Sequence, residues 1–200
     1  MKKTKIKILI ALILMLITTS CDISPIEKAH SRIDETQVLL LQYILKKTDL
    51  PGSGWSIVGQ SWESPYGGQS YAVVYLRDKN VFISPAVTIY SSDKQAQQGY
   101  KDMENEWFDV TNVRPKEPYT PLDQDDDYRF ECLQMKPNDP LLDCIYLQRH
   151  NQLINFVKIN LDSSSANNLT FEQIHDLLSI LDKRLNEVVI DVNPKDITTP

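Results

Sequence analysis

The chain has 200 residues, of which 21 are Lys or Arg and 27 are Asp or Glu, so its net charge near neutral pH is −6. The first 20 residues contain four of the lysines and no acidic residue, so the remainder has 17 basic and 27 acidic side chains, a net of −10. This acidity argues against nucleic acid and against anionic lipid as main partners, because both are negatively charged. The length after residue 20 fits one domain that buries about 70% of its unfolded surface.

The amino-terminal 21 residues have the pattern of an export signal. Four lysines between Lys2 and Lys7 precede the apolar run Ile8–Ile17, and small residues then lead to Cys21. As a helix this run extends about 15 Å, roughly half of a bilayer core, so it is too short for a membrane span. Residues 1–21 thus resemble a bacterial lipoprotein precursor. The resemblance implies that residues 1–20 are removed as a signal peptide and that Cys21 receives a diacylglyceryl group.

One position departs from the lipoprotein pattern. Thr18 stands three residues before Cys21, where such signals usually have Leu or a similar aliphatic residue. Thr18 and Ser20 also suit an ordinary signal peptidase that cuts after Ser20, which would leave Cys21 as an unmodified thiol. With lipidation, residues 21–31 form a lipidated tether, and two or three acyl chains anchor the protein stably to the outer face of the cytoplasmic membrane or to another envelope membrane.

Cys132 and Cys144 form an even pair in an exported chain, which favours a disulfide. A strong turn signal, residues 137–140, lies midway between them and is centred on Asn138. A zinc site or a catalytic thiol is a poorer interpretation, because the pair has no neighbouring histidine and a lone thiol has no obvious base. A hairpin about the turn places three pairs of residues opposite each other: Cys132 and Cys144, Phe130 and Tyr146, and Tyr128 and Gln148.

The first half of the predicted domain contains a helix, three strands and a second helix. The first helix is expected at about residues 31–48, with Val38, Leu41 and Leu45 in its apolar stripe, joined by Leu40 and Ile44. The second begins with a capping-box pattern at Ser92 and Gln95, and its stripe is Ala96, Tyr100, Met103 and Trp107. The expected strands are 55–62, 69–77 and 81–90.

The second half repeats this order after a proline-rich connector, residues 109–126. Thr170 and Gln173 form a capping-box pattern at the start of its helix, and the helix stripe is Ile174, Leu177, Leu181 and Leu185. The expected strands are 127–136, 141–149 and 153–161.

The repetition predicts the fold class. Two βββα halves, about 50–108 and 127–189, most simply form one α+β domain with a roughly six-stranded antiparallel sheet packed with helices. Residues 80–83 fall in the same place as residues 151–154, a period of 71. We therefore expect a single domain over residues 32–189, followed by a flexible tail at 190–200.

Residues 32–189 also resemble a known group of domains. The order of elements, the segment Leu50-Pro51-Gly52-Ser53-Gly54-Trp55 and the cysteine-bearing hairpin are similar to extracellular sensor domains of actinobacterial receptor kinases and to their stand-alone lipoprotein relatives. More distantly, the architecture resembles PsbP and Mog1-type sheets. The resemblance implies a sheet with a cleft that binds a ligand or partner, and no catalysis. Those sensor domains usually have two disulfides, whereas Cys132 and Cys144 allow this domain only one.

No catalytic, cofactor or metal motif is found. His30, His150 and His175 are scattered, and nucleophile-elbow, phosphate-loop, HExxH and dinucleotide patterns do not occur. The acidic run 123–127 lacks the glycine and the final glutamate of a calcium loop, since Tyr128 and Gln134 stand there, so a solvated connector is the better interpretation. We expect no enzyme activity; an envelope hydrolase with an unrecognised active site is the alternative.

Four aromatic residues are the candidate ligand-stacking residues: Trp55, Trp62, Tyr66 and Tyr71. They crowd the first predicted hairpin with few charges nearby, and aromatic rings of this kind stack on sugars or apolar ligands. Packing in the core is the alternative, because a sheet covered by helices needs such residues. The sequence therefore predicts a membrane-anchored binding or protein-interaction module, whose partner is an unknown protein or small-molecule ligand.

Overall fold

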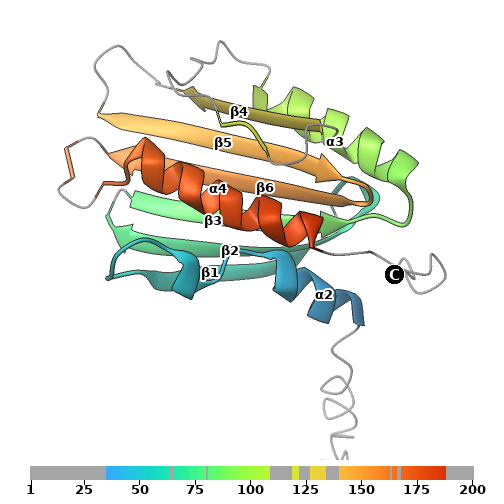
Figure 1. Ribbon diagram of the computed structural model, residues 1–200, viewed down its shortest axis with the longest axis horizontal. Coiled ribbons are helices and arrows are strands. Elements are labelled where there is room, and N and C mark those ends of the chain that lie inside the picture. The colour runs from blue at the N-terminus through green and yellow to red at the C-terminus, as the bar shows by residue number, and fades with distance from the viewer. Residues whose placement is uncertain are drawn as a thin grey trace, which may run out of the picture. The chain divides into compact units, whose positions relative to one another are not determined.

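Six strands of the computed structural model form one antiparallel sheet in the order β1-β2-β3-β6-β5-β4 (Figure 1). The structure describes residues 35–63, 65–79, 81–108, 119–121, 127–133, 140–162, 164–165 and 168–187. The predicted signal peptide, tether and tail lie outside them, as does most of the connector. The strands are β1 (Ser56–Glu63), β2 (Gln69–Asp78), β3 (Val81–Ile89), β4 (Asp127–Leu133), β5 (Leu141–His150) and β6 (Leu153–Asp162).

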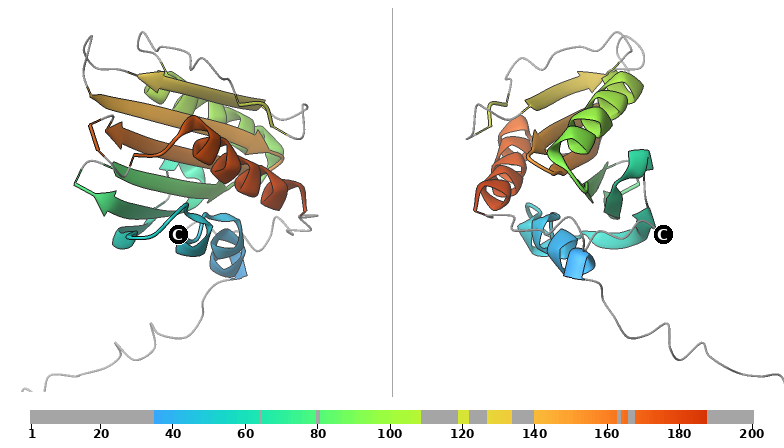
Figure 2. Two further views of the ribbon diagram at one scale, coloured as in Figure 1. Left: turned by 60° about the vertical axis from the view of Figure 1, so that its left-hand side comes forward. Right: turned by 90° about the vertical axis from the view of Figure 1, so that its right-hand side faces the viewer.

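Three α-helices accompany the sheet within the described residues, so the predicted α+β class is confirmed. They are α2 (Glu35–Tyr43), α3 (Asp93–Phe108) and α4 (Phe171–Asn186), and two short 3-10 turns are η2 (Lys47–Asp49) and η3 (Pro65–Gly67). Strands β3 and β6 pair at the centre and join the two three-stranded halves. Helix α3 covers one face of the sheet, whereas α2 and α4 cover the other (Figure 2). The repeat predicted from the sequence is therefore seen in the two sets of three strands. It does not extend to α3 and α4, because these helices lie on opposite faces of the sheet.

The main core lies between the sheet and the α2/α4 face. Alternate strand residues such as Val87, Tyr146 and Val157 point to this face, as the period of two requires. Thr170 caps α4 as predicted: Gln173 N donates to Thr170 Oγ1 at 3.2 Å, and Thr170 N donates to Gln173 Oε1 at 3.0 Å. The four residues of the predicted stripe of α4 are all buried: Ile174, Leu177, Leu181 and Leu185.

The first helix differs from its prediction. Helix α2 ends at Tyr43 instead of continuing to residue 48. Val38 and Leu41, which were expected to be buried, are 44% and 39% exposed, while Leu40 and Leu45 are buried. Contacts from distant parts of the chain explain the early end. Tyr75 Oη donates to the Leu45 carbonyl at 2.8 Å and Arg184 Nη1 donates to the Ile44 carbonyl at 2.9 Å, and these bonds replace a further helical turn.

A smaller core cluster lies under α3. Ala96, Tyr100 and Met103 of this helix are buried against β5 and β6, whose contributing residues are Ile145, Leu147 and Ile154. The predicted capping box at the helix start is half confirmed. Gln95 N donates to Ser92 Oγ at 3.3 Å, but the Gln95 side chain pairs with Ser91 Oγ instead of returning to Ser92.

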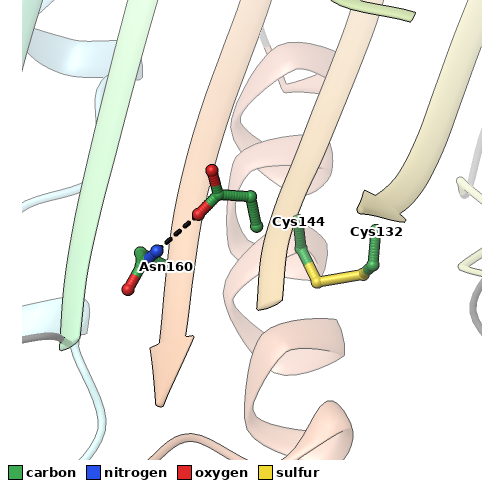
Figure 3. The surroundings of a disulfide bond; sticks show 4 residues. Cys132, Cys144 and Asn160 are labelled. Atoms are coloured by element: carbon green, nitrogen blue, oxygen red, sulfur yellow. Dashed lines mark hydrogen bonds between the residues drawn. A yellow bond between two sulfur atoms is a disulfide. The ribbon is translucent and has the colours of Figure 1, made fainter. Parts of the chain in front are cut away.

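The predicted cysteine hairpin has the expected register. Cys132 pairs with Cys144, Phe130 with Tyr146, and Tyr128 with Gln148. The two sulfur atoms are bonded at 2.02 Å, so β4 is covalently joined to β5 (Figure 3). On the other face of the sheet, Asn160 of β6 donates a hydrogen bond to Asp143 of β5. The hairpin and the bridge hold β4 at the edge of the sheet, and the Asn160–Asp143 bond joins β5 to β6.

Candidate functional site

The candidate site is a cleft of about 240 Å³ on the α3 face of the sheet. Its floor consists of the small side chains Ser70 and Ala72 of β2 and Ala86 and Thr88 of β3. In the strand register Ser70 lies opposite Thr88, and Ala72 lies opposite Ala86. Because α3 packs over β5 and β6, these short side chains beside it leave the space open.

Helix α3 and strand β6 provide an apolar wall. Met103, Glu106 and Trp107 line the cleft together, because residues three and four apart project from the same side of a helix. Phe156 of β6 lies beside Trp107, with ring centroids 5.0 Å apart. Lys158 places its ammonium 5.7 Å from the Trp107 ring and forms an ion pair with Asp143 at 3.3 Å.

A second wall comes from the segment between β1 and β2. Glu63 at the end of β1 and Tyr66 in η3 line the cleft, and Tyr66 is 42% exposed. Tyr66 has a φ of 52°, the left-handed region that non-glycine residues seldom adopt. A Cβ at Gly68 would overlap Thr88 and Tyr90, so glycine there lets the η3 segment lie close to β3. The tight turn thus sets the position of the Tyr66 ring.

The cleft is mostly apolar, with polar groups of two kinds. At the floor Thr88 Oγ1 donates to Ser70 Oγ at 3.1 Å, so these two buried hydroxyls bond each other. Glu63 and Glu106 are exposed carboxylates from different elements. Among the described lining residues there is no Lys or Arg. An apolar group that carries a positive charge therefore matches this lining best.

A second, polar depression of about 480 Å³ lies between α3 and β4. Its lining includes Glu104, and Arg129 beside it bonds Glu104 at 3.2 Å and Glu131 at 2.8 Å. Burial is the main reason that the pKa of Tyr100, another lining residue, is raised. Here charged groups are largely paired with one another, which favours the apolar cleft as the candidate site.

The structure does not bring the four predicted stacking residues together. Trp55 is buried and its indole donates to the Pro51 carbonyl at 3.0 Å. Trp62 is 46% exposed and stacks on Tyr71 at 4.3 Å, on the α2/α4 face of the sheet. Of the four, Tyr66 lines the cleft. Trp107 was predicted to face the sheet, and it does so as a half-buried residue. That Trp107 lines a cleft was not predicted from the sequence.

The histidines and acidic residues lie apart from the cleft. His150 ends β5, and the His175 ring on α4 lies 5.7 Å from the Tyr119 ring; His30 and the acidic run 123–126 are outside the described residues. In the described part of the chain, no group of His, Cys, Asp or Glu side chains lies close enough together to bind a metal ion. None of its helices is both long and apolar enough to cross a membrane.

Comparison with known proteins gives a likeness of fold. No protein-family model matches the sequence, and no curated protein matches it. Among solved structures, the chain is similar to the extracellular domain of PknH from Mycobacterium tuberculosis, with a TM-score of 0.53 and 8% sequence identity. The match covers 78% of this chain and 98% of that chain. At this identity the likeness shows the fold alone, and at that level it agrees with the resemblance inferred from the order of elements.

Proposed function

We propose that this protein is an exported, lipid-anchored binding module that holds a ligand or a partner in the cleft between α3 and strands β2 and β3. The observation that carries the proposal is the lining of this cleft, where Tyr66, Trp107 and Phe156 surround a floor of small side chains. Concave sites of this kind, mostly apolar with a few polar groups, are typical of ligand binding. The likeness to an extracellular domain fits an exported location.

Binding without catalysis is the role that the cleft chemistry favours. The hydroxyls of Ser70 and Thr88 bond each other at the floor, and the described lining contains no histidine beside them to activate a nucleophile. The fully buried Asp182 belongs to α4 and accepts a hydrogen bond from Gln148, on the opposite face of the sheet. At this position the Asp182 carboxylate stabilises the packing of α4 on the sheet and is not part of the cleft.

The cleft is tested with a matched pair of tryptophan variants. Protein extracted gently from its own membranes is examined by native mass spectrometry for a retained ligand. We expect Trp107→Ala to lose the ligand and Trp62→Ala to keep it, because Trp62 lies on the other face of the sheet. Retention by Trp107→Ala, or loss by Trp62→Ala alone, would show that the ligand binds elsewhere.

The lipid anchor is tested separately by metabolic labelling with a radioactive fatty acid. Cys21→Ser should abolish the label and either release the protein from membranes or leave an uncleaved precursor. The matched control is the double variant Cys132→Ser/Cys144→Ser, which removes the other cysteines and should retain the label. Equal labelling of wild type and Cys21→Ser would remove the anchor from the proposal and leave the cleft untouched.

A further inference from the structure

We infer that the cleft receives a lysine or arginine side chain of a partner protein. The inference rests on the proposed function and adds the chemistry of the occupant. Three features support it: the charge of the lining, the kind of apolar surface, and the size and position of the cleft.

The charge of the lining is negative. Glu63 of β1 and Glu106 of α3 both line the cleft and are exposed, so they remain hydrated and available to a cation at its rim. After removal of residues 1–20 the whole chain has a net charge of −10 (17 basic and 27 acidic side chains). This field attracts basic partners and repels acidic ones.

The apolar surface is of a kind that binds basic side chains. Lysine and arginine have long apolar stems that pack on apolar surfaces while the charged end stays near water. Cations also bind favourably over the faces of tryptophan and tyrosine rings. Lys158 shows this within the chain, since its ammonium lies 5.7 Å from the Trp107 ring. Tyr66, Phe156 and Met103 complete a surface for the stem.

The size of the cleft favours one side chain. Its 240 Å³ lie below the 300–1,000 Å³ usual for sites of small-molecule ligands. A single long side chain of a partner fits such a space while its backbone stays outside, at the surface.

The position of the cleft also suits a partner protein. Glu63 belongs to β1, which is an edge strand of the sheet. Within β1, Glu63 is the single charged residue, and Ile57, Val58 and Trp62 are 48%, 57% and 46% exposed. The other edge, β4, carries Asp127, Arg129 and Glu131, charges of the kind that protect edge strands from association. A partner chain therefore approaches at β1, beside the cleft.

The test uses the full mature protein in detergent with 5-fluorotryptophan incorporated, so that fluorine NMR follows each tryptophan. Trp107→Phe assigns the Trp107 signal. The probes are four pentapeptides, acetyl-Gly-Ala-X-Ala-Gly-amide, in which X is arginine, lysine, norleucine or glutamate. We expect arginine and lysine to shift the Trp107 signal with dissociation constants at least about fivefold below that of norleucine, and glutamate to produce no shift.

Charge variants then identify the rim. Glu63→Gln and Glu106→Gln should each weaken binding of the arginine peptide by roughly two- to fivefold, the range expected for exposed ion pairs. Binding of the norleucine peptide should be unchanged. Glu172→Gln is the matched control, because Glu172 is also exposed but lies on α4 at the opposite face. Equal weakening by Glu172→Gln would show that only the general charge of the protein matters and would overturn the assignment of the rim.

The remaining outcomes separate this inference from the proposed function. If norleucine binds as tightly as arginine, the inferred charge selectivity is wrong and the cleft remains a binding site. If no peptide shifts Trp107 but a small molecule that co-purifies does, the occupant is not a side chain, while the proposed function stands. If neither peptides nor co-purified molecules shift Trp107, both fail.

Discussion

Gly99 of α3 packs directly on the ring of Tyr90, with no room for a Cβ atom between the helix and the end of β3. Tyr90 is fully buried, and its hydroxyl has no hydrogen-bond partner among the described residues. This contact fixes how closely α3 approaches the sheet. Since Trp107 lies two turns further along the same helix, the contact also positions one wall of the cleft.

Gly99→Ala should therefore destabilise the fold although alanine is the better helix former. The gain in helix propensity is about 1 kcal/mol, whereas overpacking of a filled core costs about 1–3 kcal/mol. We expect a net loss of about 1–2 kcal/mol in urea unfolding. Adding Tyr90→Phe should recover part of this loss, because the phenol oxygen is the atom nearest the new methyl group.

The matched control is Gly59→Ala in β1. A Cβ there meets Val74 at 3.7 Å, an ordinary van der Waals distance, so the expected change is below about 0.5 kcal/mol. Equal losses for Gly59→Ala and Gly99→Ala would show that the contact with Tyr90 is not tight.

Local signals allowed most of the fold to be predicted. The capping box at Thr170, the apolar stripe of α4 and the hairpin register of Cys132 each depend on residues close together in the sequence. All three predictions are confirmed. The prediction for α2 was wrong because the end of this helix depends on Tyr75 and Arg184, which are far along the chain. The cleft was missed for the same reason: its floor, Ala72 and Ala86, meets Trp107 only in the folded sheet.

Removal of the Cys132–Cys144 bridge should lower stability without unfolding the domain. The bridge closes a loop with a sequence separation of 12, for which the chain-entropy model gives about 3 kcal/mol. In a domain of this size that corresponds to roughly 6–12 °C in Tm. The reduced protein should stay folded because the Phe130 and Tyr146 rings remain in contact, with centroids 6.4 Å apart.

Circular dichroism melts with and without a reductant measure this effect. The double variant Cys132→Ala/Cys144→Ala should melt near the reduced wild type and should not respond to reductant. Peptide mapping without reduction should yield one linked peptide that contains both cysteines. Two freely alkylated thiols in the purified protein would contradict the bridge and would weaken the proposal of an exported location.

Asp182 should be more important for stability than its neighbours on α4. It is fully buried and accepts hydrogen bonds from Gln148 Nε2 at 2.8 Å and from Tyr119 Oη at 3.2 Å. Asp182→Ala removes the acceptor of both buried hydrogen bonds and should cost about 2–4 kcal/mol in urea unfolding. Asp176→Asn, at an exposed position of the same helix, should change stability by less than about 0.5 kcal/mol. Similar values for the two variants would show that the Asp182 network does not stabilise the fold.

Alkaline pH should destabilise the protein through its buried tyrosines. Burial raises the pKa of Tyr43 from 10.0 to about 12, and it also raises the pKa of Tyr90, Tyr100 and Tyr119. Between pH 10 and 12 the unfolded chain has released protons that the folded protein still holds, so stability falls as pH rises through this window. Below pH 10 these tyrosines are protonated in both the folded and the unfolded protein, and their contribution to the free energy of unfolding is fully present.

Tyr43→Phe isolates one of these groups. The Tyr43 hydroxyl is buried without a hydrogen-bond partner among the described residues, so its removal should leave stability at pH 8 unchanged or slightly higher. Above pH 10 the variant should lose stability less steeply, by up to about 1.4 kcal/mol per pH unit. Urea unfolding at pH 8, 10, 11 and 12 measures the slope, and absorbance at 295 nm follows phenolate formation. An unchanged slope would mean that the Tyr43 phenol titrates alike in the folded and unfolded protein, contrary to its burial against the sheet.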